Sequence, residues 1–181
     1  KDDKHAPQII KAANCELCTY SEESKEADFV ASDIRYVSQP DFVGTEFHIS
    51  GKYDMEVRLG IPGLFNVVNA LAAVSVCSFL GLDQARISHA LENIRVNGRM
   101  EIVYTSERCT VLVDYAHNAV SMESLLSTLR DYKPKRLVCV FGCGGNRSKD
   151  RRYSMGEIGG KMADLSIITA DNSRYEKVED I

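Results

Sequence analysis

The chain has 181 residues, of which 44% are hydrophobic and 27% are charged, so it can hold one large domain or two small ones with a real core. A net charge of −4 provides no broad basic field, which argues against nucleic acid as a partner. No apolar run approaches the length that crosses a bilayer, and residues 1–5 are not followed by the apolar segment of a signal peptide. We therefore expect a cytoplasmic protein without a membrane span.

The six cysteines predict structural thiols rather than a metal centre. Cys77, Cys109 and Cys139 lie in apolar stretches, where cysteine acts as a small hydrophobic residue. Cys15 and Cys18 have the spacing of a redox or metal site, but no second pair has matching spacing. Whether these two cysteines have any further role stays open.

The first third of the chain predicts a short helix followed by antiparallel strands. Residues 5–14 carry Pro7 in the first turn of a helix, and residues 15–20 and 28–37 have the pattern of strands. Residues 45–49 and 55–59 alternate polar with apolar side chains around a turn, which is typical of a hairpin. We interpret residues 29–59 as an antiparallel flap rather than a catalytic centre.

Residues 65–80 predict a helix that is apolar all round, hence buried, and that ends at Gly81. Asn66 and Asn69 lie one turn apart at its start. A role as helix cap explains Asn66, whereas Asn69 is unusual in a buried helix because a buried amide needs partners. A ligand contact for Asn69 therefore stays open. Asp83 caps a second helix, which ends near residues 96–99, where we place a boundary between domains 1–97 and 98–181.

The second domain predicts alternating strands and helices. Apolar runs at residues 111–113, 137–141 and 165–169 each end in a polar loop, and residues 121–132 and 152–163 predict the helices between them. We interpret the first run as a strand buried on both faces of a parallel sheet. Parallel strands bring their carboxyl ends to one edge, where ligands bind in open α/β sheets. The sequence therefore predicts an α/β fold with three loops at one candidate site.

Those three loops carry the candidate side chains. Asp114 and His117 follow the first strand, a glycine cluster and Arg147 follow the second, and Asn172 and Arg174 follow the third. The glycines do not have dinucleotide-fingerprint spacing, and the chain contains no P-loop. Guanidinium groups suit carboxylates and phosphates.

Two structural alternatives to a ligand-binding role stay open. In the first, the two arginines pair with Asp150, Glu157 or Glu176 at the surface, and residues 149–152 form a solvated helix start. His117 alone is more often structural than a general base.

Five motifs in order give the chain a resemblance to a known family. Phe65-Asn66-x-x-Asn69, Gly98-Arg99-Met100-Glu101 and Asp114-Tyr115-Ala116-His117 resemble the signatures of the Mur ligases. The loops at residues 141–147 and 171–174 narrow the resemblance to the branch that makes UDP-N-acetylmuramyl-tripeptide. It implies that residues 1–97 are the C-terminal half of a central ATP-binding domain, and that residues 98–181 are an incomplete Rossmann-like C-terminal domain. The P-loop, a carbamylated lysine and the UDP site then lie upstream.

The resemblance also implies a reaction. It is ATP-dependent addition of a diamino acid to UDP-N-acetylmuramoyl-L-Ala-D-Glu through an acyl phosphate in peptidoglycan synthesis, by a monomer. Mg²⁺, with ligands mostly upstream, neutralises the phosphate charge. By position, Arg99 is catalytic and reaches the terminal phosphate. The implied ATP-binding residues are Asn66, Asn69, Arg99, Asp114 and His117, and those for the amino acid are Arg147, Asn172 and Arg174.

The last loop bears on the amino acid. In the family, an Asp-Asn-Pro-Arg loop accompanies meso-diaminopimelate, so Arg174 favours that substrate. Ser173 in place of proline and Asn146 in place of aspartate keep L-lysine open. Folylpolyglutamate synthetase, cyanophycin synthetase and a non-catalytic binding module are the alternatives, and the two arginine loops argue against the first two. Without a P-loop, the isolated chain is expected to be inactive.

Overall fold

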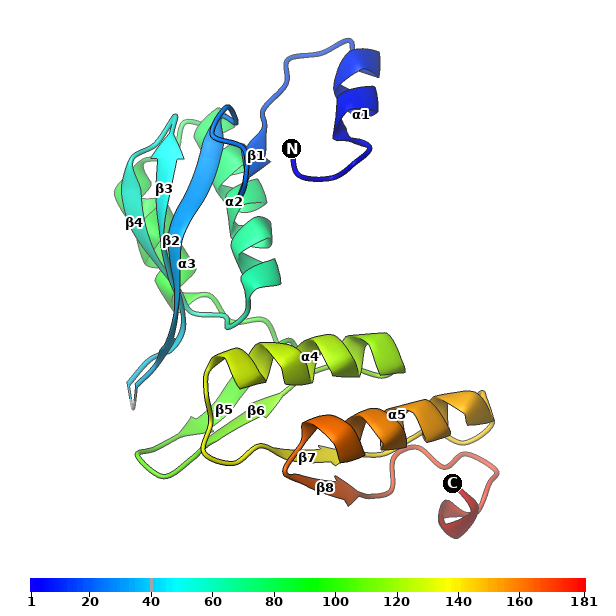
Figure 1. The fold of residues 1–181 in the computed structure, drawn as a ribbon. Helices are drawn as coiled ribbons and strands as arrows, with labels where there is room; N and C mark the ends of the chain where they lie inside the picture. The colour runs from blue at the N-terminus through cyan, green and yellow to red at the C-terminus, as the bar shows by residue number, and fades with distance from the viewer. Residues whose placement is uncertain (40) are drawn as a thin grey trace. The chain divides into compact units, whose positions relative to one another are not determined.

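The computed structural model describes residues 1–39 and 41–181, which form two compact units, Lys1–Asp114 and Tyr115–Ile181 (Figure 1). The predicted α/β class is confirmed. The helices are α1 (Ala6–Ala12), α2 (Leu64–Phe79), α3 (Gln84–Asn93), α4 (Ala119–Asp131), α5 (Lys149–Met162) and the 3-10 helix η1 (Val178–Asp180). The strands are β1 (Tyr20–Ser21), β2 (Phe29–Ser38), β3 (Val43–Gly51), β4 (Met55–Leu59), β5 (Glu101–Thr105), β6 (Thr110–Val113), β7 (Val138–Phe141) and β8 (Leu165–Ile168). The domain boundary at residue 97 stays a prediction.

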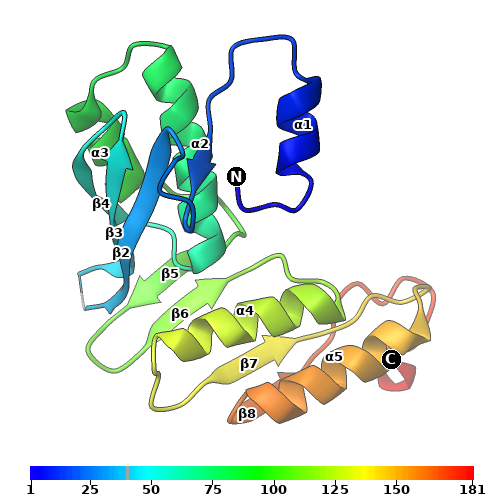
Figure 2. The same cartoon turned by 45° about the horizontal axis from the view of Figure 1, so that its top comes forward.

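The first unit is built on a four-stranded sheet of order β1-β2-β3-β4. Strands β2, β3 and β4 are antiparallel, as the hairpin pattern predicted, and β1 runs parallel to β2. Alternation places one side chain in two on the face that α2 and α3 cover (Figures 1 and 2). Phe29, Phe47, Ile49 and Val57 are at most 1% exposed there. The interpretation as a flap is therefore wrong, because this sheet carries the core of the unit.

Helix α2 is buried along one face only. Val67, Leu71 and Val74 face the sheet, whereas Phe65 and Phe79 are 43% and 77% exposed, so the prediction of burial all round is wrong. Its end before Gly81, whose φ is +74°, is confirmed.

Three smaller predictions concern the flanking elements. The Asp83 carboxylate accepts a hydrogen bond from the backbone N–H of Arg86 at 2.9 Å, so the predicted cap of α3 is also confirmed. Pro7 lies in the first turn of α1 as predicted. The strand predicted over residues 15–20 is nearly all wrong, because β1 contains only Tyr20 and Ser21.

Strand β6 departs from its prediction. It pairs with β5 in an antiparallel hairpin, and Val111 and Val113 are 46% and 48% exposed. The prediction of a strand buried on both faces of a parallel sheet is therefore wrong here. A run of three branched apolar residues does not distinguish a buried parallel strand from one arm of a hairpin, because neither pattern alternates over so short a distance.

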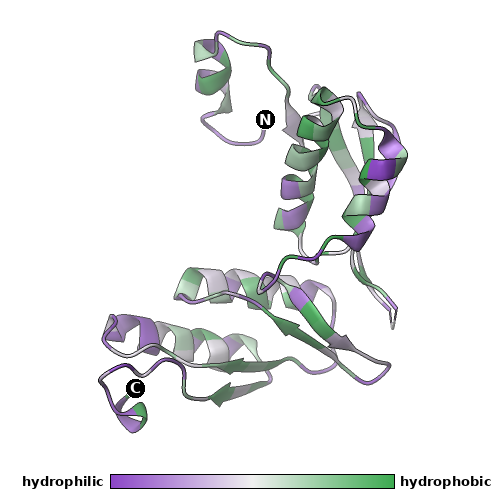
Figure 3. Cartoon of the chain, turned by 180° about the vertical axis from the view of Figure 1, so that it is seen from behind, coloured by the Kyte–Doolittle hydropathy of each residue, from purple (hydrophilic) through white to green (hydrophobic). Residues whose placement is uncertain are grey.

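Strands β7 and β8 confirm the parallel pairing predicted for the second unit. Their register runs from Val138 opposite Leu165 to Phe141 opposite Ile168, and α5 connects them. Helices α4 and α5 lie side by side (Figure 2) over a small core of Met122, Leu126, Leu137 and Met155. Both strands are mostly hydrophobic (Figure 3), yet Val140 and Ile168 are 62% and 72% exposed.

Candidate functional site

The loops that follow β7 and β8 lie against one another. The Gly145 N–H donates to the Asn172 carbonyl at 2.8 Å, and the Tyr175 N–H donates to Asn146 Oδ1 at 3.2 Å. A Cβ at Gly145 would lie 1.9 Å from the Ser173 carbonyl oxygen, so only glycine permits this approach. The prediction of three loops at one edge of one sheet is therefore confirmed only for the two loops that follow β7 and β8, because β6 pairs with β5 in a separate sheet of the described residues.

Two arginines stand on the joined loops without an ion-pair partner. Arg147 and Arg174 are both exposed, and neither guanidinium forms a salt bridge within residues 1–39 and 41–181. Glu157 instead pairs with Lys161, and Glu176 pairs with Arg152 at 2.8 Å. The alternative of surface ion pairs for Arg147 and Arg174 is therefore wrong in the part of the chain that the structure describes. Both cations remain available to an anionic ligand.

Asn172 shapes the loop that carries Arg174. Its side-chain oxygen accepts a hydrogen bond from the Arg174 N–H at 3.2 Å, while its carbonyl accepts the bond from Gly145. Arg174 has φ +51° and Asn146 has φ +52°, both in the left-handed region. Asparagine tolerates that region readily, but arginine adopts it at a cost in free energy. Ser173 cannot restrain the backbone of this loop as a proline would, so the hydrogen bonds of Asn172 provide that restraint.

Arg152 and Glu176 are the residues that sequence reasoning missed. The Arg152 side chain is only 9% exposed, so the interpretation of residues 149–152 as a solvated helix start is wrong for it. Glu176 accepts hydrogen bonds from the Asn146 N–H and from Arg152, and these two bonds lower the pKa of its carboxyl group. The alternative above named the right carboxylate, Glu176, but the wrong arginines.

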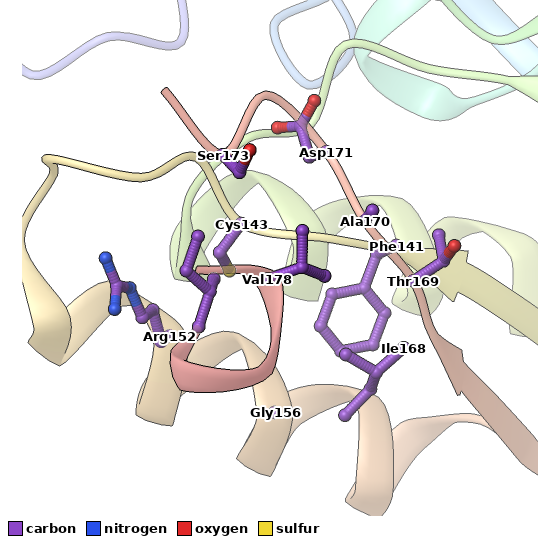
Figure 4. A pocket seen from close by; sticks show the side chains of 11 residues that line it. Phe141, Cys143, Arg152, Gly156, Ile168, Thr169, Ala170, Asp171, Ser173 and Val178 are labelled. Atoms are coloured by element: carbon purple, nitrogen blue, oxygen red, sulfur yellow. The ribbon is translucent and has the colours of Figure 1, made fainter. Parts of the chain in front are cut away.

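A cavity of about 190 Å³ lies beside this ion pair (Figure 4). Phe141 and Cys143 line it from the end of β7, Gly156 from α5, and Asp171 from the loop after β8. Burial raises the pKa of the Cys143 thiol, which keeps it protonated and a poor nucleophile. The cysteine therefore acts as a small side chain in a tight loop.

The two asparagines of α2 differ in what they offer a ligand. Asn66 does not cap the helix, since Gly63 occupies that position; its amide donates to the Pro62 carbonyl at 2.7 Å. Asn69 is exposed, so the argument from a buried amide is wrong. Its side-chain NH₂ donates to Asn66 Oδ1 at 3.2 Å, and its side-chain oxygen Oδ1 accepts no hydrogen bond from the described residues. Asn66 thus holds Asn69 in position while Asn69 presents a donor and an acceptor.

Asp114 fixes the turn that carries Arg99. One of its carboxylate oxygens accepts a hydrogen bond from the Met100 N–H at 2.8 Å, where Met100 has φ +46°. Glu101 closes the same turn by accepting from the Gly98 N–H at 2.6 Å. Arg99 is exposed at the turn. The carboxylate predicted to contact a ligand therefore also orders the backbone beside a predicted catalytic cation.

His117 lies at the start of the second unit. Its Nδ1 is 3.1 Å from the Tyr115 carbonyl oxygen, which can only accept, so Nδ1 carries the proton in the neutral ring and Nε2 is an acceptor. The two rings are 5.1 Å apart and tilted by 54°. Both side chains are exposed, an arrangement suited to contact with a planar ligand.

Two searches of the described residues bear on metal and membrane. No group of three or more histidine, cysteine, aspartate or glutamate side chains in them is placed to hold a metal ion. No helix among them is long and apolar enough to cross a membrane.

Each of the six cysteines is a free thiol, and Cys15, Cys18 and Cys109 are exposed. The expectation that Cys109 is a buried small hydrophobic residue is therefore wrong.

Comparison with known proteins bears on the whole chain. Residues 1–77 match the Mur ligase middle domain, and residues 98–181 match the Mur ligase glutamate ligase domain. The chain belongs to the Mur ligase family. The five motifs therefore mark a true relationship, and neither match includes residues 78–97.

Two relatives are named as diaminopimelate ligases. The chain is 40% identical to a UDP-N-acetylmuramoyl-L-alanyl-D-glutamate–2,6-diaminopimelate ligase of Alkaliphilus oremlandii, over 97% of the chain and 36% of that enzyme. It is 39% identical to ligase 1 of the same name from Clostridium acetobutylicum, over 99% of the chain and 37% of that enzyme. The chain thus spans a little over a third of the length of these relatives.

Solved structures agree with this fold. A structure of a UDP-N-acetylmuramoyl-L-alanyl-D-glutamate–2,6-diaminopimelate ligase superposes with a TM-score of 0.72 at 31% identity, covering 99% of the chain and 37% of that structure. A folylpolyglutamate synthase from Thermotoga maritima superposes with a TM-score of 0.57 at 21% identity, covering 80% of the chain and 40% of that structure. The second likeness shows the fold alone.

Proposed function

We propose that this chain is part of an ATP-dependent ligase that adds a diamino acid to UDP-N-acetylmuramoyl-L-Ala-D-Glu in peptidoglycan synthesis. The observation that carries the proposal is the pair of unpaired arginines on loops that hydrogen bonds join. Two guanidinium groups on fixed supports suit an amino acid with two carboxylates. meso-Diaminopimelate is therefore favoured over L-lysine, in agreement with the two relatives that are named as diaminopimelate ligases.

The residues of this chain fit an ATP site in part. Asn69 offers an amide with donor and acceptor capacity to the adenine, supported by Asn66. Asp114 accepts hydrogen bonds at the ribose, and His117 lies beside the nucleotide. Arg99 meets the terminal phosphate, where a fixed cation stabilises charge that develops during transfer. ATP supplies the phosphoryl group that activates the dipeptide carboxylate as an acyl phosphate, and Mg²⁺ neutralises the phosphates through ligands carried mostly elsewhere in the protein.

Three further parts of the proposal concern the whole protein. Strands β7 and β8 belong to a Rossmann-like, mostly parallel sheet, which their parallel register supports. The ligase works as a monomer in the cytoplasm. The 181-residue chain, which has no P-loop, has neither ligase nor ATPase activity by itself. ATP hydrolysis above the buffer rate by the pure chain would contradict this last point.

The test of the amino-acid site is Arg174→Ala in the full-length ligase. Leaving one carboxylate of diaminopimelate unpaired should lower kcat/KM for that substrate by about 10²-fold or more. Steady-state ligation assays measure the effect, with Arg108→Ala as control because Arg108 is an exposed arginine in the β5–β6 turn. A fall of less than about threefold would show that Arg174 does not clamp the substrate.

A further inference from the structure

The ion pair between Arg152 and Glu176 is the least exposed in the described residues. The two side chains are 9% and 26% exposed, and Arg152 approaches both carboxylate oxygens, at 2.9 and 2.8 Å. Arg152 Nε is buried and has no hydrogen-bond partner in the described residues. An ion pair that leaves a buried donor unsatisfied is a weak source of stability. Its position therefore needs another explanation.

That position is the junction of three elements. Arg152 projects from the beginning of α5 beside the cavity, with Ser173 and Asp171 on the loop above it (Figure 4). Glu176 accepts a further hydrogen bond from the backbone N–H of Asn146. Asn146 immediately precedes Arg147, and Glu176 lies two residues after Arg174. One carboxylate thus joins the helix to both arginine-bearing loops.

We propose that Arg152 and Glu176 are positioning residues that hold the loops after β7 and β8 together and so set the spacing of Arg147 and Arg174. The inference rests on the proposed function and extends it to two residues that contact no substrate. Asn146 and Arg174 both have left-handed backbones, which persist only when their surroundings hold them. Glu176 supplies that restraint at Asn146 through its carboxylate and at Ser173 through its own N–H, which donates to the Ser173 carbonyl at 3.0 Å.

The consequence falls on selection of the amino acid. Diaminopimelate has one carboxylate at each end of a chain of limited length. Binding both carboxylates at once therefore depends on the distance between the two guanidinium groups. L-lysine has one carboxylate and needs only one of them. Loosening the contacts between Arg152, Glu176 and the two loops should therefore weaken the binding of diaminopimelate more than that of L-lysine. The binding of ATP and of the UDP-linked dipeptide should change least.

The experiment compares Glu176→Gln with wild type in the full-length ligase. We expect KM for diaminopimelate to rise about tenfold or more, because small misplacement of a binding group is costly. KM for ATP should change by less than about twofold, since its candidate residues lie on other segments. The ratio of kcat/KM for diaminopimelate to that for L-lysine should fall. Glu157→Gln is the matched control, because Glu157 forms an exposed pair with Lys161 on the same helix.

Arg152→Lys keeps the test decisive if Glu176→Gln does not fold. Lysine keeps the positive charge but lacks the planar guanidinium that approaches both Glu176 oxygens. Its KM for diaminopimelate should rise by about two- to fivefold, while its KM for ATP should stay unchanged. An unchanged KM, or an equal loss toward all three substrates, would overturn the inference. Failure of the wild-type enzyme to ligate diaminopimelate would instead overturn the proposed function.

Discussion

The sheet of the first unit and the paired loops of the second are held together by different forces. Strands β2, β3 and β4 bury alternate apolar side chains against α2 and α3, and their glycines and charges are secondary. The loops after β7 and β8 bury little apolar surface and rely on hydrogen bonds, one ion pair and a glycine without room for a side chain. The stability of the first region therefore depends on the volume of its buried side chains, whereas that of the second depends on the positions of its backbone atoms.

The difference separates stability from binding. A core of apolar side chains contributes most of the free energy of folding but presents no polar group to a ligand. The paired loops contribute less to folding and carry exposed cations at their tips. Substitutions in the two regions should therefore move different observables, and each prediction below tests one side of that division.

The largest effect should come from Phe47→Ala in the first unit. Phe47 is 0% exposed and lies on β3 in the centre of the core. Removing its ring should lower the free energy of unfolding by about 3–5 kcal/mol through lost burial and the cavity left behind. Urea unfolding followed by circular dichroism measures the change. Phe79→Ala is the control, since that ring is 77% exposed and its loss should cost within about 0.5 kcal/mol.

A smaller loss of stability should accompany Gly145→Ala in the second unit. The new Cβ would lie 1.9 Å from the Ser173 carbonyl, so the loops must separate at a cost of about 1–3 kcal/mol. Gly160→Ala is the matched control: nothing lies within 4 Å of its Cβ position in α5, and alanine there should stabilise by about 0.5–1 kcal/mol. Denaturant unfolding gives both values. Equal effects of the two substitutions would show that the loops do not depend on close approach.

The regular elements of the fold were predictable from pattern. The hairpin of β3 and β4 alternates over enough residues to define its buried face, and Asp83 and Gly81 mark helix ends by simple chemistry. Strand β6 was not predictable in this way, because a hairpin arm and a buried parallel strand share the same short apolar run. Helix α2 shows the same kind of error: apolar composition all round does not decide burial, and Phe65 and Phe79 are exposed although they are apolar.

The loop arginines of the candidate site could be predicted from the sequence, whereas the buried ion pair beneath them could not. Arg147 and Arg174 follow the ends of paired strands, so topology alone places their loops side by side. Arg152 looked like one charge in a run of four, and its burial depends on how α5 begins against the returning chain. Such a contact joins residues 24 positions apart and leaves no periodic signal. The nucleotide contacts of Asn69, Arg99, Asp114 and His117 stay predictions.

The smallest effect should be a pH dependence confined to the paired loops. The Asn146 N–H and then Arg152 lower the pKa of Glu176 below its ordinary value of 4.5. A lowered pKa in the folded state means that this carboxylate stabilises the loops fully above pH 4.5 and stops doing so as the pH falls through its folded value. The backbone amide signal of Asn146 in NMR spectra should therefore shift in that acidic range, whereas the Val57 amide in the core of the first unit should not. The Glu176→Gln variant should lose the transition, and its persistence there would assign it to another carboxylate.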